Sequence, residues 1–90
     1  MNKYSMFCVA VFELLSKKCN DSKFKGMFEF NYNSSILRIK YVTVIIDIVH
    51  YNDERLICDV YNSNDNIVYD EVESVKEEII ELVNAFNQKQ

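Results

Sequence analysis

The chain has 90 residues, of which 49% are hydrophobic and 27% charged, and this composition excludes both a disordered chain and a second domain beside the one expected over residues 1–90. A single glycine, Gly26, and no proline exclude a glycine-rich phosphate-binding loop. The formal net charge of −4 is unevenly distributed. Residues 1–45 form a basic half with seven Lys/Arg and three Asp/Glu, whereas residues 46–90 form an acidic half with three Lys/Arg and eleven Asp/Glu.

The N-terminal segment is predicted to be an amphipathic helix, because apolar residues recur at spacings of three and four. These residues are Tyr4, Phe7, Cys8, Val11, Leu14 and Leu15. Lys17 and Lys18 follow at the expected C-terminal end, where the helix dipole favours positive charge. The apolar run is well short of the roughly 20 residues that cross a bilayer. Glu13 interrupts it and no small-residue cleavage site follows, so we expect neither a signal peptide nor a membrane partner.

The middle of the chain is predicted to form strands. A first strand is indicated by aromatic residues that alternate with polar ones, namely Phe24, Phe28, Phe30 and Tyr32. The apolar run 36–50 changes its alternation near Tyr41 and Val42, which predicts one long strand with a bulge or a sharp bend. A third strand is predicted around residues 56–61, and a short fourth strand at 67–69, after an Asn-rich loop.

The last segment is predicted to be a second amphipathic helix. Its apolar residues again fall three and four positions apart, at Val72, Val75, Ile79, Leu82, Val83 and Phe86. A capping box, either Asp70 with Glu73 or Ser74 with Glu77, places its start between residues 70 and 75. The sequence therefore predicts an α+β fold: an N-terminal helix, a four-strand antiparallel meander with a bulged long strand, and a C-terminal helix, with both helices on one sheet face.

The three cysteines are odd in number and widely spaced, which argues against a disulfide framework or a metal site and favours a reducing, cytoplasmic setting. Cys8 and Cys58 lie on apolar faces and are expected in the core, whereas Cys19 follows two lysines and is expected to be exposed.

No residue pattern predicts catalysis. His50 is the only histidine, stands beside a predicted turn and has no paired nucleophile in the sequence. Asn62, Asn64, Asn66 and Glu73 match calcium-loop spacing, but the first position is not Asp and the sixth is Ile67 instead of Gly. We therefore expect no enzyme, no metal and no cofactor.

Carboxylates line the outer face of the predicted C-terminal helix, at Asp70, Glu73, Glu77 and Glu81. Like charges at this spacing destabilise a helix by about 0.2–0.5 kcal/mol per pair, which invites a functional explanation. A ladder of negative charges mimics a nucleic-acid backbone, so a basic cleft that binds phosphates should also bind it. The predicted partner-binding set is completed by Asp59 and Asp65, and by Tyr69, with Tyr61 as a second aromatic anchor.

Two other interpretations of the charge are possible. The acidic residues can simply form the solvated face of an amphipathic helix. The N-terminal lysines can form a basic patch that binds nucleic acid directly, but the chain is acidic overall, so we expect no direct nucleic-acid binding. The order of helix, strands and helix is similar to a double-stranded-RNA-binding domain, yet the last helix begins with acids where that family needs lysines.

The short acidic chain, its helix–meander–helix layout and its carboxylate-lined helix resemble small phage-encoded inhibitors of bacterial defence, particularly anti-CRISPR proteins that imitate DNA. The resemblance covers layout and charge and transfers no functional residue. It implies a non-enzymatic inhibitor in the host cytoplasm that blocks the basic nucleic-acid-binding cleft of a larger protein, such as a CRISPR effector.

Two alternatives come from other functional classes. One is an immunity or antitoxin-like protein that neutralises a basic toxin. The other is a homodimeric accessory module, in which an exposed sheet edge or the apolar residues Val42, Val44, Ile46 and Ile48 form the contact.

Overall fold

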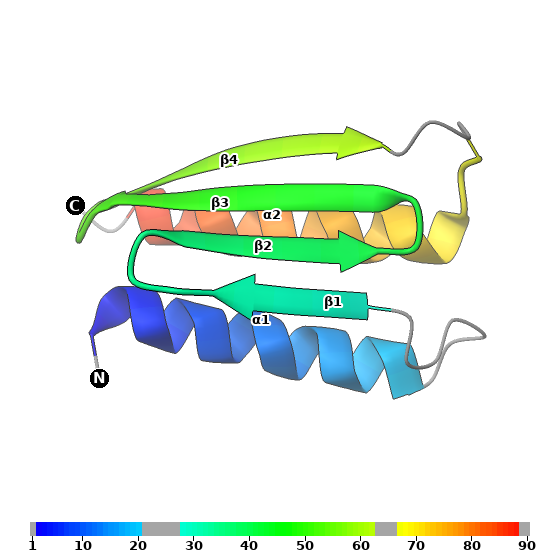
Figure 1. Ribbon diagram of the computed structural model, residues 1–90, viewed down its shortest axis with the longest axis horizontal. Coiled ribbons are helices and arrows are strands. Elements are labelled where there is room, and N and C mark those ends of the chain that lie inside the picture. The colour runs from blue at the N-terminus through cyan, green and yellow to red at the C-terminus, as the bar shows by residue number, and fades with distance from the viewer. Residues whose placement is uncertain (1, 21–27, 63–66, 89–90) are drawn as a thin grey trace.

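A computed structural model describes residues 2–20, 28–62 and 67–88. Within these ranges the chain forms a helix, four strands and a second helix, which confirms the predicted α+β fold (Figure 1). The elements are α1 (Lys3–Asn20), β1 (Phe28–Tyr32), β2 (Ile36–Tyr41), β3 (Val44–Asn52), β4 (Arg55–Asn62) and α2 (Asp70–Asn87).

The strands form an antiparallel sheet in the order β1-β2-β3-β4, so that β1 and β4 are its edges. Both helices cover the same face of this sheet, as predicted, and they pack against each other (Figure 1). The other face, which we call the open sheet face, carries no helix in the described part of the chain.

The core lies between the sheet and the helix layer. Strand residues of one parity point into it and meet the apolar stripes of both helices. Its almost fully buried side chains include Val11, Leu15, Leu37, Ile39, Ile46, Ile48, Leu56 and Ile79. Because each such side chain contributes roughly 1.5–3 kcal/mol on burial, this single cluster holds the two layers together.

The predicted long strand over residues 36–50 is instead two strands joined by a tight turn. Val42 and Thr43 form the connection, and Val42 has a φ of 55°. A positive φ at the first central position is a feature of type II′ hairpin turns. The change of alternation at Tyr41 and Val42 therefore marks a reversal of the chain rather than a bulge.

Other element boundaries also differ from the predictions. Phe24 lies outside the described residues, and β1 begins at Phe28. Residues 67–69 are not a strand but lead into α2, and the fourth strand is β4. The helix α2 begins at Asp70, within the predicted range. Its N-cap is Tyr69, which makes no side-chain capping hydrogen bond, whereas Asp70 and Ser74 already lie inside the helix. Neither predicted capping box therefore forms.

Cys19 is 3% exposed, so the prediction of an exposed thiol was wrong. It is buried because α1 continues to Asn20 and places Cys19 on its inner side. Cys8 is buried, as predicted, and Cys58 is half-buried.

The apolar residues that the sequence suggested as a dimer contact do not form an exposed surface. Val44, Ile46 and Ile48 are at most 2% exposed, because their parity directs them toward the helices. No helix in the described ranges is both long and apolar enough to span a membrane.

Candidate partner-binding face of the C-terminal helix

The helix α2 is amphipathic because its apolar residues fall on one side. Val72, Val75, Ile79 and Val83 are buried against the sheet, which turns the carboxylates away from the core. Asp70, Glu71 and Glu73 occupy the first turn. Negative charge there is stabilised by the helix dipole, by typically 0.3–1 kcal/mol per residue. The dipole therefore accounts for the acids of the first turn, but not for those further along.

Glu73 and Glu78 on α2 form ion pairs with lysines. Glu73 pairs with Lys76 one turn later on the same helix. The Oε2 atom of Glu78 lies 3.6 Å from Nζ of Lys18, which connects α2 to the end of α1. The charges of Glu73 and Glu78 are thus compensated within the protein.

Asp70, Glu77 and Glu81 form an exposed row along α2, and we call them the outer-face carboxylates. Among the described residues, none of the three has an ion-pair partner. With a rise of 1.5 Å per residue, they are spaced by roughly 10 Å and roughly 6 Å along the helix axis. They are a row of solvated negative charges, of which Asp70 is stabilised by the helix dipole, whereas Glu77 and Glu81 lie beyond the first turn.

The remaining predicted site residues lie elsewhere. Asp59 is on the open sheet face, directly opposite Asp47 in the pairing of β3 with β4, and the sheet separates it from α2. Tyr69 is half-buried and packs against the core at the start of α2. Asp65 lies outside the described residues. The structure therefore brings together Asp70, Glu73, Glu77 and Glu81, but not Asp59.

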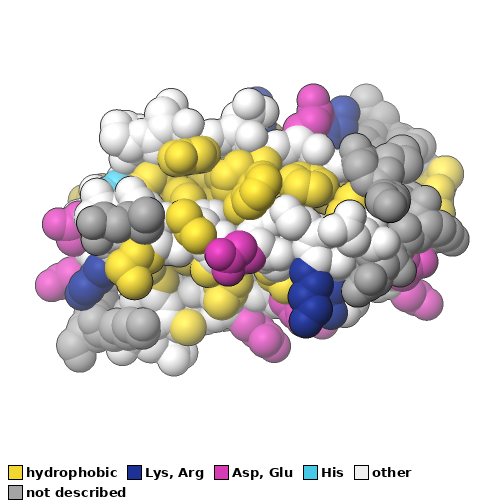
Figure 2. Space-filling model, turned by 90° about the horizontal axis from the view of Figure 1, so that it is seen from below, with side chains coloured by type: hydrophobic (Ala, Val, Ile, Leu, Met, Phe, Trp, Pro, Cys, Tyr) yellow, Lys and Arg dark blue, Asp and Glu magenta, His cyan; other side chains and the backbone are white. Residues whose placement is uncertain are grey.

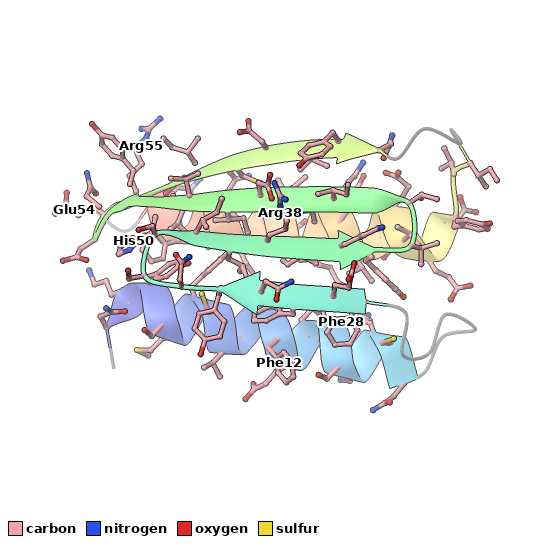
Figure 3. All side chains as sticks on the ribbon, in the orientation of Figure 1. Phe12, Phe28, Arg38, His50, Glu54 and Arg55 are labelled. Atoms are coloured by element: carbon pink, nitrogen blue, oxygen red, sulfur yellow. The ribbon has the colours of Figure 1, made fainter. Side chains whose placement is uncertain are left out.

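The open sheet face carries a polar network centred on Asp47. Arg38 donates two hydrogen bonds to its carboxylate, Nε to Oδ1 at 2.7 Å and Nη2 to Oδ2 at 2.9 Å. The Tyr61 hydroxyl donates a third to Oδ2 at 2.9 Å. These contacts lower the pKa of Asp47, chiefly through the hydrogen bonds from Arg38, and the bond to Asp47 raises the pKa of Tyr61. Figure 3 shows the position of Arg38 among the central strands of the sheet. The network balances the charge of Arg38 with that of Asp47.

The sequence interpretation missed this network, although a signal for it exists. Arg38 and Asp47 are equidistant from the turn at Val42 and Thr43, so antiparallel pairing places them opposite each other. Treating residues 36–50 as one strand concealed that symmetry.

His50 makes structural contacts. Its ring stacks on Tyr4 of α1, with centroids 4.2 Å apart and planes within 4°. Its Nδ1 donates to the backbone carbonyl of Ser34, at 3.0 Å, and its Nε2 lies 3.5 Å from Oδ1 of Asp53. Burial raises the pKa of the nearby core thiol Cys8, which keeps this thiol protonated and poorly nucleophilic.

Across residues 2–20, 28–62 and 67–88, no three His, Cys, Asp or Glu side chains gather in a way that could hold a metal ion. Comparison of the chain with protein-family models, curated proteins and solved structures finds no significant match.

Proposed function

We propose that this protein is a non-enzymatic inhibitor that docks the outer face of α2 onto a basic, nucleic-acid-binding surface of a larger protein. The observation that carries the proposal is the row of outer-face carboxylates, Asp70, Glu77 and Glu81, exposed and without partners in the described part of the chain. Glu73 stands beside this row and is shared with Lys76. The proposed class is that of anti-CRISPR proteins that imitate DNA.

Inhibition would be steric. A partner whose lysines and arginines normally contact phosphates gains similar charge contacts from the carboxylates of α2, and the bulk of the domain then excludes the nucleic acid. Opposite charges also steer the two proteins together, so association should be fast and sensitive to salt.

The proposed surface is confined to one side of the molecule. Asp59 lies across the sheet from α2, and its neighbours Asp47 and Arg38 already neutralise each other. A single rigid cleft that contacts Glu77 and Glu81 has no route to Asp59. We therefore leave Asp59 outside the proposed interface.

The test is a charge-matched comparison of two variants. One variant, Asp70→Asn/Glu77→Gln/Glu81→Gln, neutralises the outer-face carboxylates. Its control, Glu29→Gln/Glu54→Gln/Asp59→Asn, removes the same three charges from exposed positions outside α2. Tagged proteins are used to capture partners from a bacterial lysate at about 0.1 M and about 1 M salt, between which the Debye length falls from about 10 Å to about 3 Å.

We expect the wild-type protein and the control to retain a nucleic-acid-binding protein at low salt, and to release it at high salt or on addition of duplex DNA. The outer-face variant should lose it. Equal capture by both variants, or capture that DNA does not displace, would contradict the proposal.

A further inference from the structure

A groove runs between α1 and α2 on the solvent side of the helix layer. It consists of two adjoining hollows with volumes of about 490 Å³ and about 600 Å³. Both are lined by Ala10 of α1 and by Leu82 and Ala85 of α2. Since an alanine side chain is a single methyl group, the two helices leave space here that larger side chains would fill.

The floor of the groove is apolar. Met6, which is 59% exposed, lines the first hollow together with Phe7 and Phe86, and Leu14 lines the second. Figure 2 looks onto α1 and shows hydrophobic side chains reaching its outward surface between charged ones. An apolar groove with a polar rim is a feature of surfaces at which proteins bind other molecules.

The rim of the groove is more acidic than basic. Glu13, Glu78 and Glu81 stand around the second hollow, against Lys17. The charge of Glu78 is balanced by Lys18 on α1, so Glu13 and Glu81 carry the excess. The far end of the groove is lined by one cation, Lys3, and one carboxylate, Asp53, so it adds no net charge. A molecule that fits the groove should therefore combine an apolar side with positive charge along its flank.

We propose that this groove binds an amphipathic helix of the partner protein, with its apolar side between α1 and α2 and with Lys or Arg beside Glu13 and Glu81. A groove between two helices with small residues at the contact suits a third helix, because small side chains allow helix axes to approach to about 8–10 Å. The inference rests on the proposed function, since Glu81 belongs both to the outer-face carboxylates and to the groove rim. It adds the kind of partner segment that is recognised.

The test uses a fluorescently labelled basic amphipathic peptide, LKKLLKLLKKLLKL, and its acidic counterpart, LEELLELLEELLEL. Binding is measured by fluorescence anisotropy. The groove variant Ala10→Gln/Ala85→Gln fills the hollows with uncharged side chains that favour helix. Its control, Val9→Gln/Asn84→Gln, alters exposed neighbours on the same helices that do not line the groove. The thermal midpoint of each variant checks its folding.

We expect the wild-type protein and the control to bind the basic peptide within two-fold of each other, and at least about ten-fold more tightly than the acidic peptide. The groove variant should lose at least about ten-fold in affinity for the basic peptide, which is about 1.4 kcal/mol. Unchanged binding by the folded groove variant, or equal binding of both peptides, would overturn the inference.

Two further outcomes separate this inference from the proposed function. If sedimentation shows a dimer of the wild-type protein that the groove variant dissociates, a second copy occupies the groove and the inference fails. The variant Asp70→Asn/Glu77→Gln leaves the groove lining intact. If it still captures the partner while the groove variant does not, the partner binds in the groove, and docking through Asp70 and Glu77 of the outer face is ruled out.

Discussion

Asn87 of α2 binds both backbone polar groups of Leu56 in β4. Its Oδ1 accepts a hydrogen bond from the Leu56 N–H at 2.7 Å, and its Nδ2 donates one to the Leu56 carbonyl at 2.9 Å. The Asn87 carboxamide thus satisfies backbone hydrogen-bonding groups at the edge of the sheet, as a neighbouring strand would. The contact anchors the C-terminal end of α2, the helix that carries the outer-face carboxylates.

Replacement of Asn87 by Ala should destabilise the fold. Two backbone groups of a part-buried residue would lose their partner, which costs about 1–3 kcal/mol for an unsatisfied group. Urea unfolding measures the change. Asn84→Ala, at an exposed position one turn earlier, is the control and should change the free energy of unfolding by less than about 0.5 kcal/mol. Equal midpoints for the two variants would show that the Asn87 contact contributes nothing.

Val42→Gly should stabilise the protein. A non-glycine residue with positive φ costs roughly 1–2 kcal/mol, and Val42 has a φ of 55°. Loss of its half-buried methyl groups offsets part of the gain, so we expect a net increase of up to about 1 kcal/mol in the free energy of unfolding. Thr43→Gly, at the next position of the same turn, removes a buried side chain and should destabilise. A lower thermal midpoint for Val42→Gly would argue against the turn described above.

Stability should depend on pH through Asp47. Arg38 and Tyr61 lower the pKa of Asp47 in the folded protein, so the unfolded chain binds the extra proton. The stabilisation is therefore present above the ordinary Asp pKa of about 3.9 and is lost as the pH falls through the lower, folded value. Wild type should be more stable than Asp47→Asn at neutral pH, and the difference should shrink below about pH 4.

Urea midpoints measured from neutral to acidic pH check this. The control is Asp59→Asn, which removes the opposing carboxylate but leaves the Arg38–Asp47 pair intact. A difference between wild type and Asp47→Asn that stays constant down to the lowest pH would contradict the assignment.

The three thiols should differ in reactivity. Cys8 and Cys19 are 3% exposed, whereas Cys58 is half-buried on β4. Burial raises the pKa of Cys58, so its modification by a thiol reagent should be slow. It should still be faster than modification of Cys8 and Cys19, because Cys58 is more exposed than either. Mass spectrometry after timed labelling assigns the sites. Rapid labelling of Cys19 in the native protein would contradict its burial.

The local patterns of the chain determined both helices and the position of the acidic row. Residues at α-helical spacing share a face whatever the rest of the molecule does, so Val72, Val75 and Ile79 defined the inner side of α2 and thereby its outer one. The alternation within the strands separated their two faces, but it did not show that Val44, Ile46 and Ile48 face the core rather than a dimer partner.

Pairings between distant residues were decided only by the tertiary structure. Alternation near Val42 does not distinguish a bulge from a turn until β2 and β3 pair, and that pairing joins Arg38 to Asp47. The opposite faces of Asp59 and Glu81, and the groove beside Ala10 and Ala85, depend on how the helices pack against the sheet. Periodicity is a property of neighbours along the chain, whereas a surface or a groove requires elements far apart in sequence to meet.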